Sequence, residues 1–187
     1  MIYSLPTEFE INGKTYKIKN KCDFRTVLQI IEILNDGSLS ESERNIKAVR
    51  SFFENGDQII DFQTAIKDMY DVINVNDGSG HNDEKSQSED KVMDWKYDYK
   101  YYIPPVNKVL GYDVRDKNRY THWWTFFAAY MEMGDCFFRQ ITSIREKLNK
   151  GERLEKWEQD FYRDNRNIID LPSAEQDEKE AWLNGAW

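Results

Sequence analysis

The first twenty residues alternate apolar and polar positions, which is the pattern of a β-hairpin. Asn12-Gly13 lies between the two runs, and both residues tolerate the positive φ of a type I′ turn. With a loop of two residues, Phe9 faces Tyr16 on one side and Glu8 opposes Lys17 on the other. Because an isolated hairpin is marginally stable, we expect its apolar face to pack against other elements.

Apolar residues then recur at helical spacing, and three helices are predicted before residue 74. Asp23 is the candidate N-cap of the first helix. Ser40 and Glu43 have the spacing of a capping box at the start of the second, and Asp57 opens the third. Each helix has a polar back, so we expect all three to share one core.

The stretch from Asn74 to Lys91 interrupts this pattern with a single aliphatic residue, Val75, among acids, serines and glycines. Such a composition buries too little apolar area to offset the entropy of ordering, which is typical of a flexible linker. The sequence therefore predicts a hairpin with three helices over residues 1–75, a linker over 76–92, an aromatic-rich helical half over 93–172 and a C-terminal tail helix over 173–187.

The second half begins with tyrosines that lead into Pro104-Pro105, which should break or kink the preceding helix. The most apolar helix starts around Asn118. It is apolar on two stripes and is therefore expected to be buried; the stripes are Tyr120, Trp124, Phe127 and Met131, and Trp123, Phe126, Tyr130 and Met133. The predicted fold class is mainly α, with a small N-terminal β-hairpin packed on a helical bundle and two helical halves joined by a flexible acidic loop.

Charge and composition exclude several classes of protein. Acids outnumber bases 34 to 26 over 187 residues, giving a net charge of −8, and this argues against binding nucleic acid. The longest uncharged run, from Tyr120 to Met131, is too short to span a bilayer, and the N-terminus has no signal-peptide pattern. Two cysteines, Cys22 and Cys136, favour a reducing compartment in which both are small apolar residues.

Candidate chemistry is sparse. His122 stands beside two tryptophans at a helix start, where capping or packing is a commoner role than acid–base catalysis. The cysteines and histidines lack the spacing of a zinc site. A calcium loop starting at Asp77 would need Gly and Glu where Asn82 and Ser88 stand. We therefore expect no catalytic residue, no metal and no cofactor.

Aromatic residues make up 14% of the chain. Core packing accounts for most of them, including Phe127 and Trp157. Trp182 and Trp187 stand on a short polar tail, where contact with a partner or with a second copy is a competing explanation. The candidate partner-binding residues are Trp123, Trp124, Tyr130, Trp182 and Trp187.

The run His122-Trp123-Trp124-Thr125-Phe126 resembles the His-Trp-Trp core of a siphophage family, the phage gene-product-fifteen family. Ile144 to Lys147, Trp157-Glu158 and Phe161 to Arg163 also resemble it, as do the opening Leu5-Pro6 and the Asp23-Phe24-Arg25 helix start. The similarity covers roughly residues 1 to 171. Its departures lie at Pro104-Pro105 and after residue 171.

The resemblance implies a gene between those of the major tail protein and the tape-measure protein in long-tailed bacteriophages or prophages. Proteins at that place are commonly tail assembly chaperones, and no catalytic residues carry over. The expected function is non-enzymatic: to cover the tape-measure protein in the host cytoplasm before the tube polymerises, with possible contact to the major tail protein or a second copy. The alternatives are a structural tail component retained in the virion and a small enzyme using His122.

Overall fold

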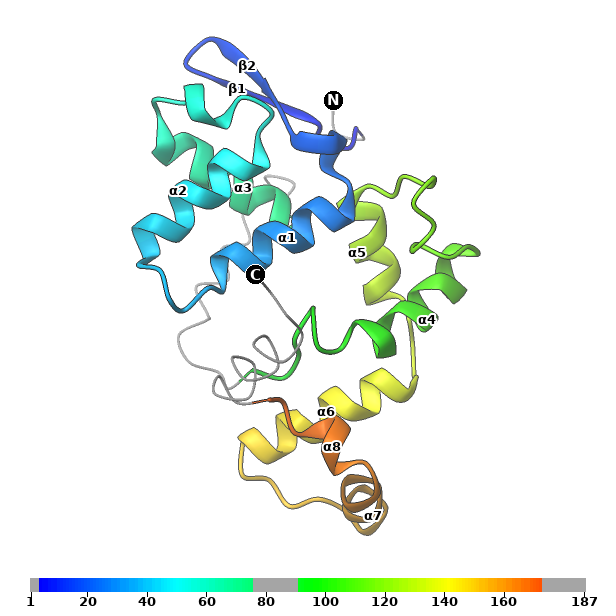
Figure 1. The fold of residues 1–187 in the computed structure, drawn as a ribbon. Helices are drawn as coiled ribbons and strands as arrows, with labels where there is room; N and C mark the ends of the chain where they lie inside the picture. Colours follow the sequence, from blue (N-terminus) through cyan, green and yellow to red (C-terminus); the bar gives the residue numbers. More distant parts are fainter. Residues whose placement is uncertain (1–3, 76–90, 173–187) are drawn as a thin grey trace, which may run out of the picture. The chain divides into compact units, whose positions relative to one another are not determined.

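The computed structural model describes residues 4–75 and 91–172 of the chain. These residues are mainly helical, with one two-stranded antiparallel sheet near the N-terminus, which confirms the predicted fold class (Figure 1). The chain divides into two compact units. The first comprises residues 1–84 and 104–133, and the second comprises 85–103 and 134–187.

The hairpin of the first unit has the predicted register. Strand β1 (Glu8–Ile11) pairs with β2 (Lys14–Lys17), so that Phe9 faces Tyr16, and both turn residues of Asn12-Gly13 have positive φ. The rings of Phe9 and Tyr16 lie 6.5 and 6.4 Å from the ring of Phe53, which is buried after the second helix. The apolar face of the hairpin is thus covered, as expected.

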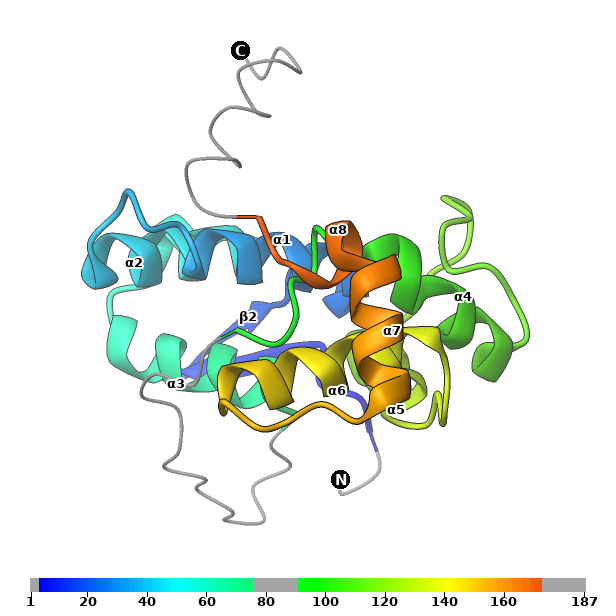
Figure 2. The ribbon, with the colours of Figure 1, turned by 90° about the horizontal axis from the view of Figure 1, so that it is seen from below.

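Three helices follow the hairpin: α1 (Phe24–Leu34), α2 (Glu41–Phe52) and α3 (Phe62–Ile73), with α1 packed against α2 (Figures 1 and 2). Asp23 caps α1, and Ser40 and Glu43 form the predicted capping box of α2. The predicted start of α3 was wrong. Residues Gly56–Gln58 form a separate 3-10 turn (η2), and α3 begins later because the Asp61 carboxylate accepts the amide of Thr64 at 3.1 Å.

Helix α5 (Trp123–Met131) completes the first unit. It begins at Trp123 rather than near Asn118, and it packs on α1 through Phe24 and Phe126, whose rings stack with centroids 4.4 Å apart. Only one of its two apolar stripes is buried, since Tyr120 and Met131 of the other stripe are half-exposed.

This arrangement differs from the sequence-based division, which grouped residues 104–133 with the C-terminal half. Long-range packing of α5 on α1 decides the grouping, and chain order does not reveal it. The predicted linker over 76–92 lies almost entirely outside the described residues, and the predicted tail helix over 173–187 lies wholly outside them.

The second unit contains α6 (Phe137–Asn149), α7 (Lys156–Asp164), α8 (Arg166–Ile169) and the first half of α4 (Tyr99–Leu110). A break or a kink was predicted at Pro104-Pro105. The break is wrong, because α4 runs through both prolines. The φ of proline is compatible with a helix, so the cost is two missing amide donors and local crowding. Burial of the neighbouring side chains offsets that cost; they are Tyr102, Ile103 and Val106.

A buried ion pair joins the elements of the second unit. Arg145 of α6 and Asp98 are 4% and 0% exposed, and their two bonds measure 2.7 and 3.0 Å. The remaining N–H groups of Arg145 donate to the backbone carbonyls of Val92, Ile168 and Ile169. All five guanidinium donors are therefore used, and α6 is fixed to α8 and to the segment before α4.

Candidate functional site

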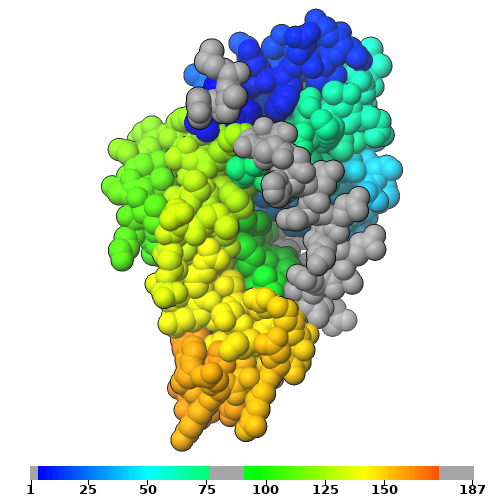
Figure 3. Space-filling model, turned by 180° about the vertical axis from the view of Figure 1, so that it is seen from behind, coloured from blue at the N-terminus to red at the C-terminus, as the bar shows by residue number. Residues whose placement is uncertain are grey.

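Aromatic side chains that are incompletely buried form a row on the second unit. The ring of Phe137 lies 5.8 Å from that of Tyr101 and 5.6 Å from that of Phe161. Trp157 stands four residues before Phe161 on α7 and so shares its face of the helix. Phe137 is 42% exposed and Trp157 is 54% exposed. We call these four residues the aromatic row; Figure 3 shows α6 and α7, which carry three of them, as adjoining yellow and orange surfaces.

The row is fixed from below by a small apolar core. Tyr101 and Phe161 pack against the buried cluster of the unit, which consists of Ile141, Ile144, Leu154 and Ile169. At one end, Lys100 lies over the Tyr101 ring with its nitrogen 5.0 Å from the centroid, and their hydrogen bond raises the pKa of Lys100. At the other end, the Trp157 indole donates to the carboxylate of Glu155 at 2.9 Å. Rings held in this way lose little entropy when a partner binds.

The orientation of α7 follows from one buried acid. Glu158 points inward, where its carboxylate binds Lys147 of α6 at 2.6 Å and accepts the amide of Glu155 at 2.8 Å. The hydrogen bond from Lys147 is the largest of the causes that hold the pKa of Glu158 below its usual value. Because neighbouring helix residues point about 100° apart, burying Glu158 directs Trp157 elsewhere, and Trp157 is exposed.

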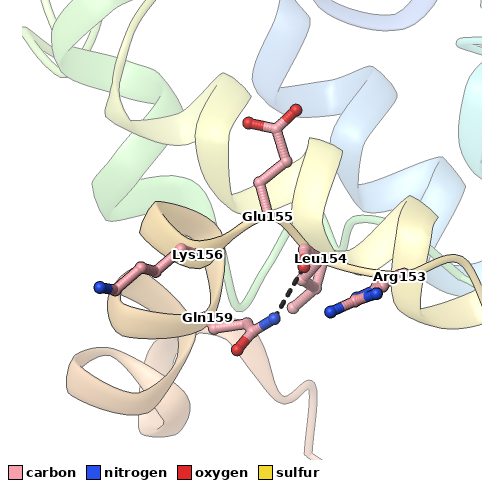
Figure 4. Close-up of a pocket in the computed structure, with 5 residues that line it drawn as sticks. All are labelled: Arg153, Leu154, Glu155, Lys156 and Gln159. Carbon is pink, nitrogen blue, oxygen red and sulfur yellow. Dashed lines mark hydrogen bonds between the residues drawn. The ribbon is translucent and has the colours of Figure 1, made fainter.

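An open hollow of about 600 Å³ lies at the start of α7. In Figure 4, Glu155 and Lys156 point away from one another, while the amide of Gln159 donates to the Leu154 carbonyl at 2.8 Å. The lining residues, completed by Arg153, include no serine, cysteine or histidine. The hollow therefore has no nucleophile paired with a base, and it provides a polar border near Trp157.

His122 caps a helix. Its Nδ1 accepts the amide of Trp124 at 3.1 Å at the start of α5, so Nε2 carries the proton and donates to the Pro6 carbonyl at 3.0 Å. Burial lowers the pKa of His122 and favours the neutral ring. Both ring nitrogens are occupied by backbone groups, which confirms the capping interpretation.

The sequence-predicted partner residues occupy different positions. Trp123 is 1% exposed and Tyr130 is buried, so both are core side chains of the first unit. Trp124 is partly buried. The two indoles bind the end of α3, where Trp123 donates to the Ile73 carbonyl at 3.0 Å and Trp124 to the Val72 carbonyl at 2.9 Å. Trp182 and Trp187 lie outside the described residues.

Sequence reasoning missed the aromatic row. Trp157 was expected in the core because it falls on an apolar stripe at helical spacing, yet it is exposed. Its neighbours Lys156 and Glu158 gave no usable signal, because the sequence does not show that Glu158 is the buried one. Phe137 gave no such signal, since it precedes Phe138, which is fully buried.

Metal binding and thiol chemistry find no support in the described residues. Over residues 4–75 and 91–172, no group of three or more His, Cys, Asp or Glu side chains is placed to hold a metal ion. In the same ranges, no helix combines the length and apolar character needed to cross a membrane. Both cysteines are free, and burial raises the pKa of the Cys22 thiol to about 12, which keeps it protonated and unreactive.

Most of the chain matches the model of a known protein family. The model of the family described as Bacteriophage Gp15 protein matches residues 1–171 of the chain. No curated protein and no solved structure matches it.

Proposed function

Because the chain belongs to the Bacteriophage Gp15 protein family, we propose that it is a non-enzymatic tail morphogenesis protein, a tail assembly chaperone that covers the tape-measure protein before the tube polymerises. The family match over residues 1–171 is the observation that carries this proposal. A further support is that His122 has both ring nitrogens engaged by backbone groups and is buried.

The aromatic row supports a chaperone role in physical terms. A tape measure is a long helical chain whose apolar stripes are uncovered until tube subunits assemble around it. Burying such a stripe gains about 25 cal/mol per Å², and rings such as Phe137 and Trp157 concentrate binding energy at low entropic cost. We propose that the row binds an amphipathic helical segment of the tape-measure protein.

The charge of the chain fits the same role. A net charge of −8 keeps a complex with an apolar client soluble. Each contact must be weak enough for arriving copies of the major tail protein to displace it, so many small contacts along the client are expected. We place the complex in the host cytoplasm, where the tail assembles.

Co-expression with the tape-measure protein of the same phage tests the proposal. The wild-type chain should raise the soluble yield of that protein and co-purify with it. Trp157→Ser should lower both, whereas Tyr99→Ser, which removes a similarly exposed ring of the same unit outside the row, should not. Urea melts of both variants check that each remains folded.

Two results would contradict different parts of the proposal. If the wild-type chain neither co-purifies nor raises the yield, the chaperone role is refuted. If both variants behave like the wild type, the chaperone role stands and the row is not its surface. Mass spectrometry of purified virions separates the alternative of a retained tail component, because a chaperone should be absent there.

A further inference from the structure

A basic recess lies on the first unit, although the chain as a whole is acidic. It measures about 430 Å³ and lies between the start of α1 and the loop before α5. Three of its lining residues are basic, Arg25, Lys117 and Arg119, and one is acidic, Asp23. We propose that this recess binds an acidic segment of a protein partner through carboxylate contacts to Lys117 and Arg119.

Arg119 is held in a conformation suited to a carboxylate. Its guanidinium lies 4.3 Å from the centre of the Tyr112 ring, and the Tyr112 hydroxyl shares a hydrogen bond with Thr121 at 3.1 Å. A guanidinium stacked on a ring keeps the N–H groups of its edge available for a bidentate acceptor. Within the part of the chain that the structure describes, no carboxylate lies within 4.0 Å of the charged nitrogens of Arg119 or Lys117.

Arg25 holds the loop that presents these two cations. Its guanidinium donates to the backbone carbonyls of Val114, Asp116 and Arg119 at 2.5, 2.9 and 3.3 Å. It also pairs with Asp23 at 3.1 Å, so the acid that lines the recess is neutralised. The loop therefore has a fixed backbone, and a partner would not have to order it.

The nearby acids do not cancel this positive charge. Asp113 is engaged by Arg115 through bonds of 2.7 to 3.1 Å, and this contact is the main cause that lowers the pKa of Asp113. Asp116 accepts the amide of Asn118 at 2.9 Å and does not line the recess. Among the residues that line the recess, basic side chains therefore exceed acidic ones by two.

An acidic polypeptide fits the recess better than a nucleic acid. Tyr120, the aromatic residue that lines it, has its hydroxyl bound to the Lys21 carbonyl at 2.6 Å, and a run of exposed rings for stacking bases is missing from the lining. A short acidic segment needs only the local field of the recess.

Fluorescence anisotropy with a labelled oligo-glutamate peptide tests the proposal on the full-length protein. Binding should be measurable at low salt and should weaken at about 0.15 M salt. The double variant Lys117→Gln, Arg119→Gln should bind about tenfold more weakly. The matched control Lys67→Gln, Lys108→Gln changes the net charge equally, outside the recess, and should bind within about twofold of the wild type.

Three outcomes would overturn the proposal. The first is that oligo-glutamate does not bind at low salt. The second is that both double variants lose the same amount of affinity for the peptide. The third is that single-stranded DNA binds more tightly than the peptide does. Both recess side chains are exposed, so the variants should retain the wild-type circular dichroism spectrum. If the double variant unfolds, Arg119→Lys replaces it: this variant keeps the charge, lacks the planar fork and should still weaken binding. None of these measurements involves the tape-measure protein, so the proposed function stands or fails separately.

Discussion

Replacing Arg145 with methionine would leave the Asp98 carboxylate buried without a counter-charge. Breaking a buried ion pair from one side costs about 3–5 kcal/mol. The substitution also removes the donors of three backbone carbonyls, those of Val92, Ile168 and Ile169, at about 1–3 kcal/mol for each one that water does not reach. Since a domain has only about 5–15 kcal/mol of stability, we expect the second unit to be largely unfolded in this variant.

Urea denaturation followed by far-ultraviolet circular dichroism measures the effect. The control is the double variant Asp98→Asn, Arg145→Met, in which no unpaired charge remains. The side-chain oxygen of the new asparagine can still accept a hydrogen bond from the backbone amide of Asp94, as the Asp98 carboxylate does at 2.9 Å. This double variant should be more stable than Arg145→Met by about 2 kcal/mol or more. A cost below about 1 kcal/mol for Arg145→Met, or a double variant no more stable than the single one, would refute the reasoning.

Three further predictions concern the first unit and the cysteines. Burial keeps the pKa of His122 below its usual value near 6.5, so the unfolded state binds more protons than the folded state. The free energy of unfolding, measured in urea melts, should therefore fall as the pH drops below about 6.5. His122→Asn keeps a capping oxygen but does not titrate, so its stability should fall less over the same pH range. Iodoacetamide should label Cys136 in the native protein and leave Cys22 unlabelled until urea is added, and early labelling of Cys22 would show that its burial is wrong. Ser40→Ala should cost about 1 kcal/mol in urea melts, because it removes the capping box with Glu43. No change in the urea midpoint would contradict this last prediction.

The features that the sequence predicted correctly are local. The turn at Asn12-Gly13 needs only two residues that tolerate positive φ, and the caps at Asp23 and Ser40 bind amides two or three residues away. All the residues of such a turn or cap lie within a few positions of one another, so the sequence predicts them without knowledge of the rest of the fold. The family resemblance was readable for the same reason, since His122 and the residues after it form one continuous run.

The features that the sequence missed depend on distant parts of the chain. Asp98 and Arg145 are 47 positions apart and look like any other charges in a chain rich in both signs. The stripe of α5 that includes Met131 is as apolar as its neighbour, yet only packing on α1 decides which stripe is buried. Trp157 is exposed because Glu158 occupies the inner side of α7, and a buried glutamate next to an exposed tryptophan reverses the usual expectation.

The packing of the first unit is completed by residues far along the chain. Phe126 stacks on Phe24, and the indoles of Trp123 and Trp124 donate to carbonyls in the last turn of α3. A ribosome synthesises the three N-terminal helices long before it adds these residues. The surfaces of α1 and α3 that these residues cover therefore stay exposed on the nascent chain while residues 74–122 are being synthesised. A protein proposed to cover the apolar surface of another chain thus exposes apolar surface of its own, with the same risk of aggregation, while it is being synthesised.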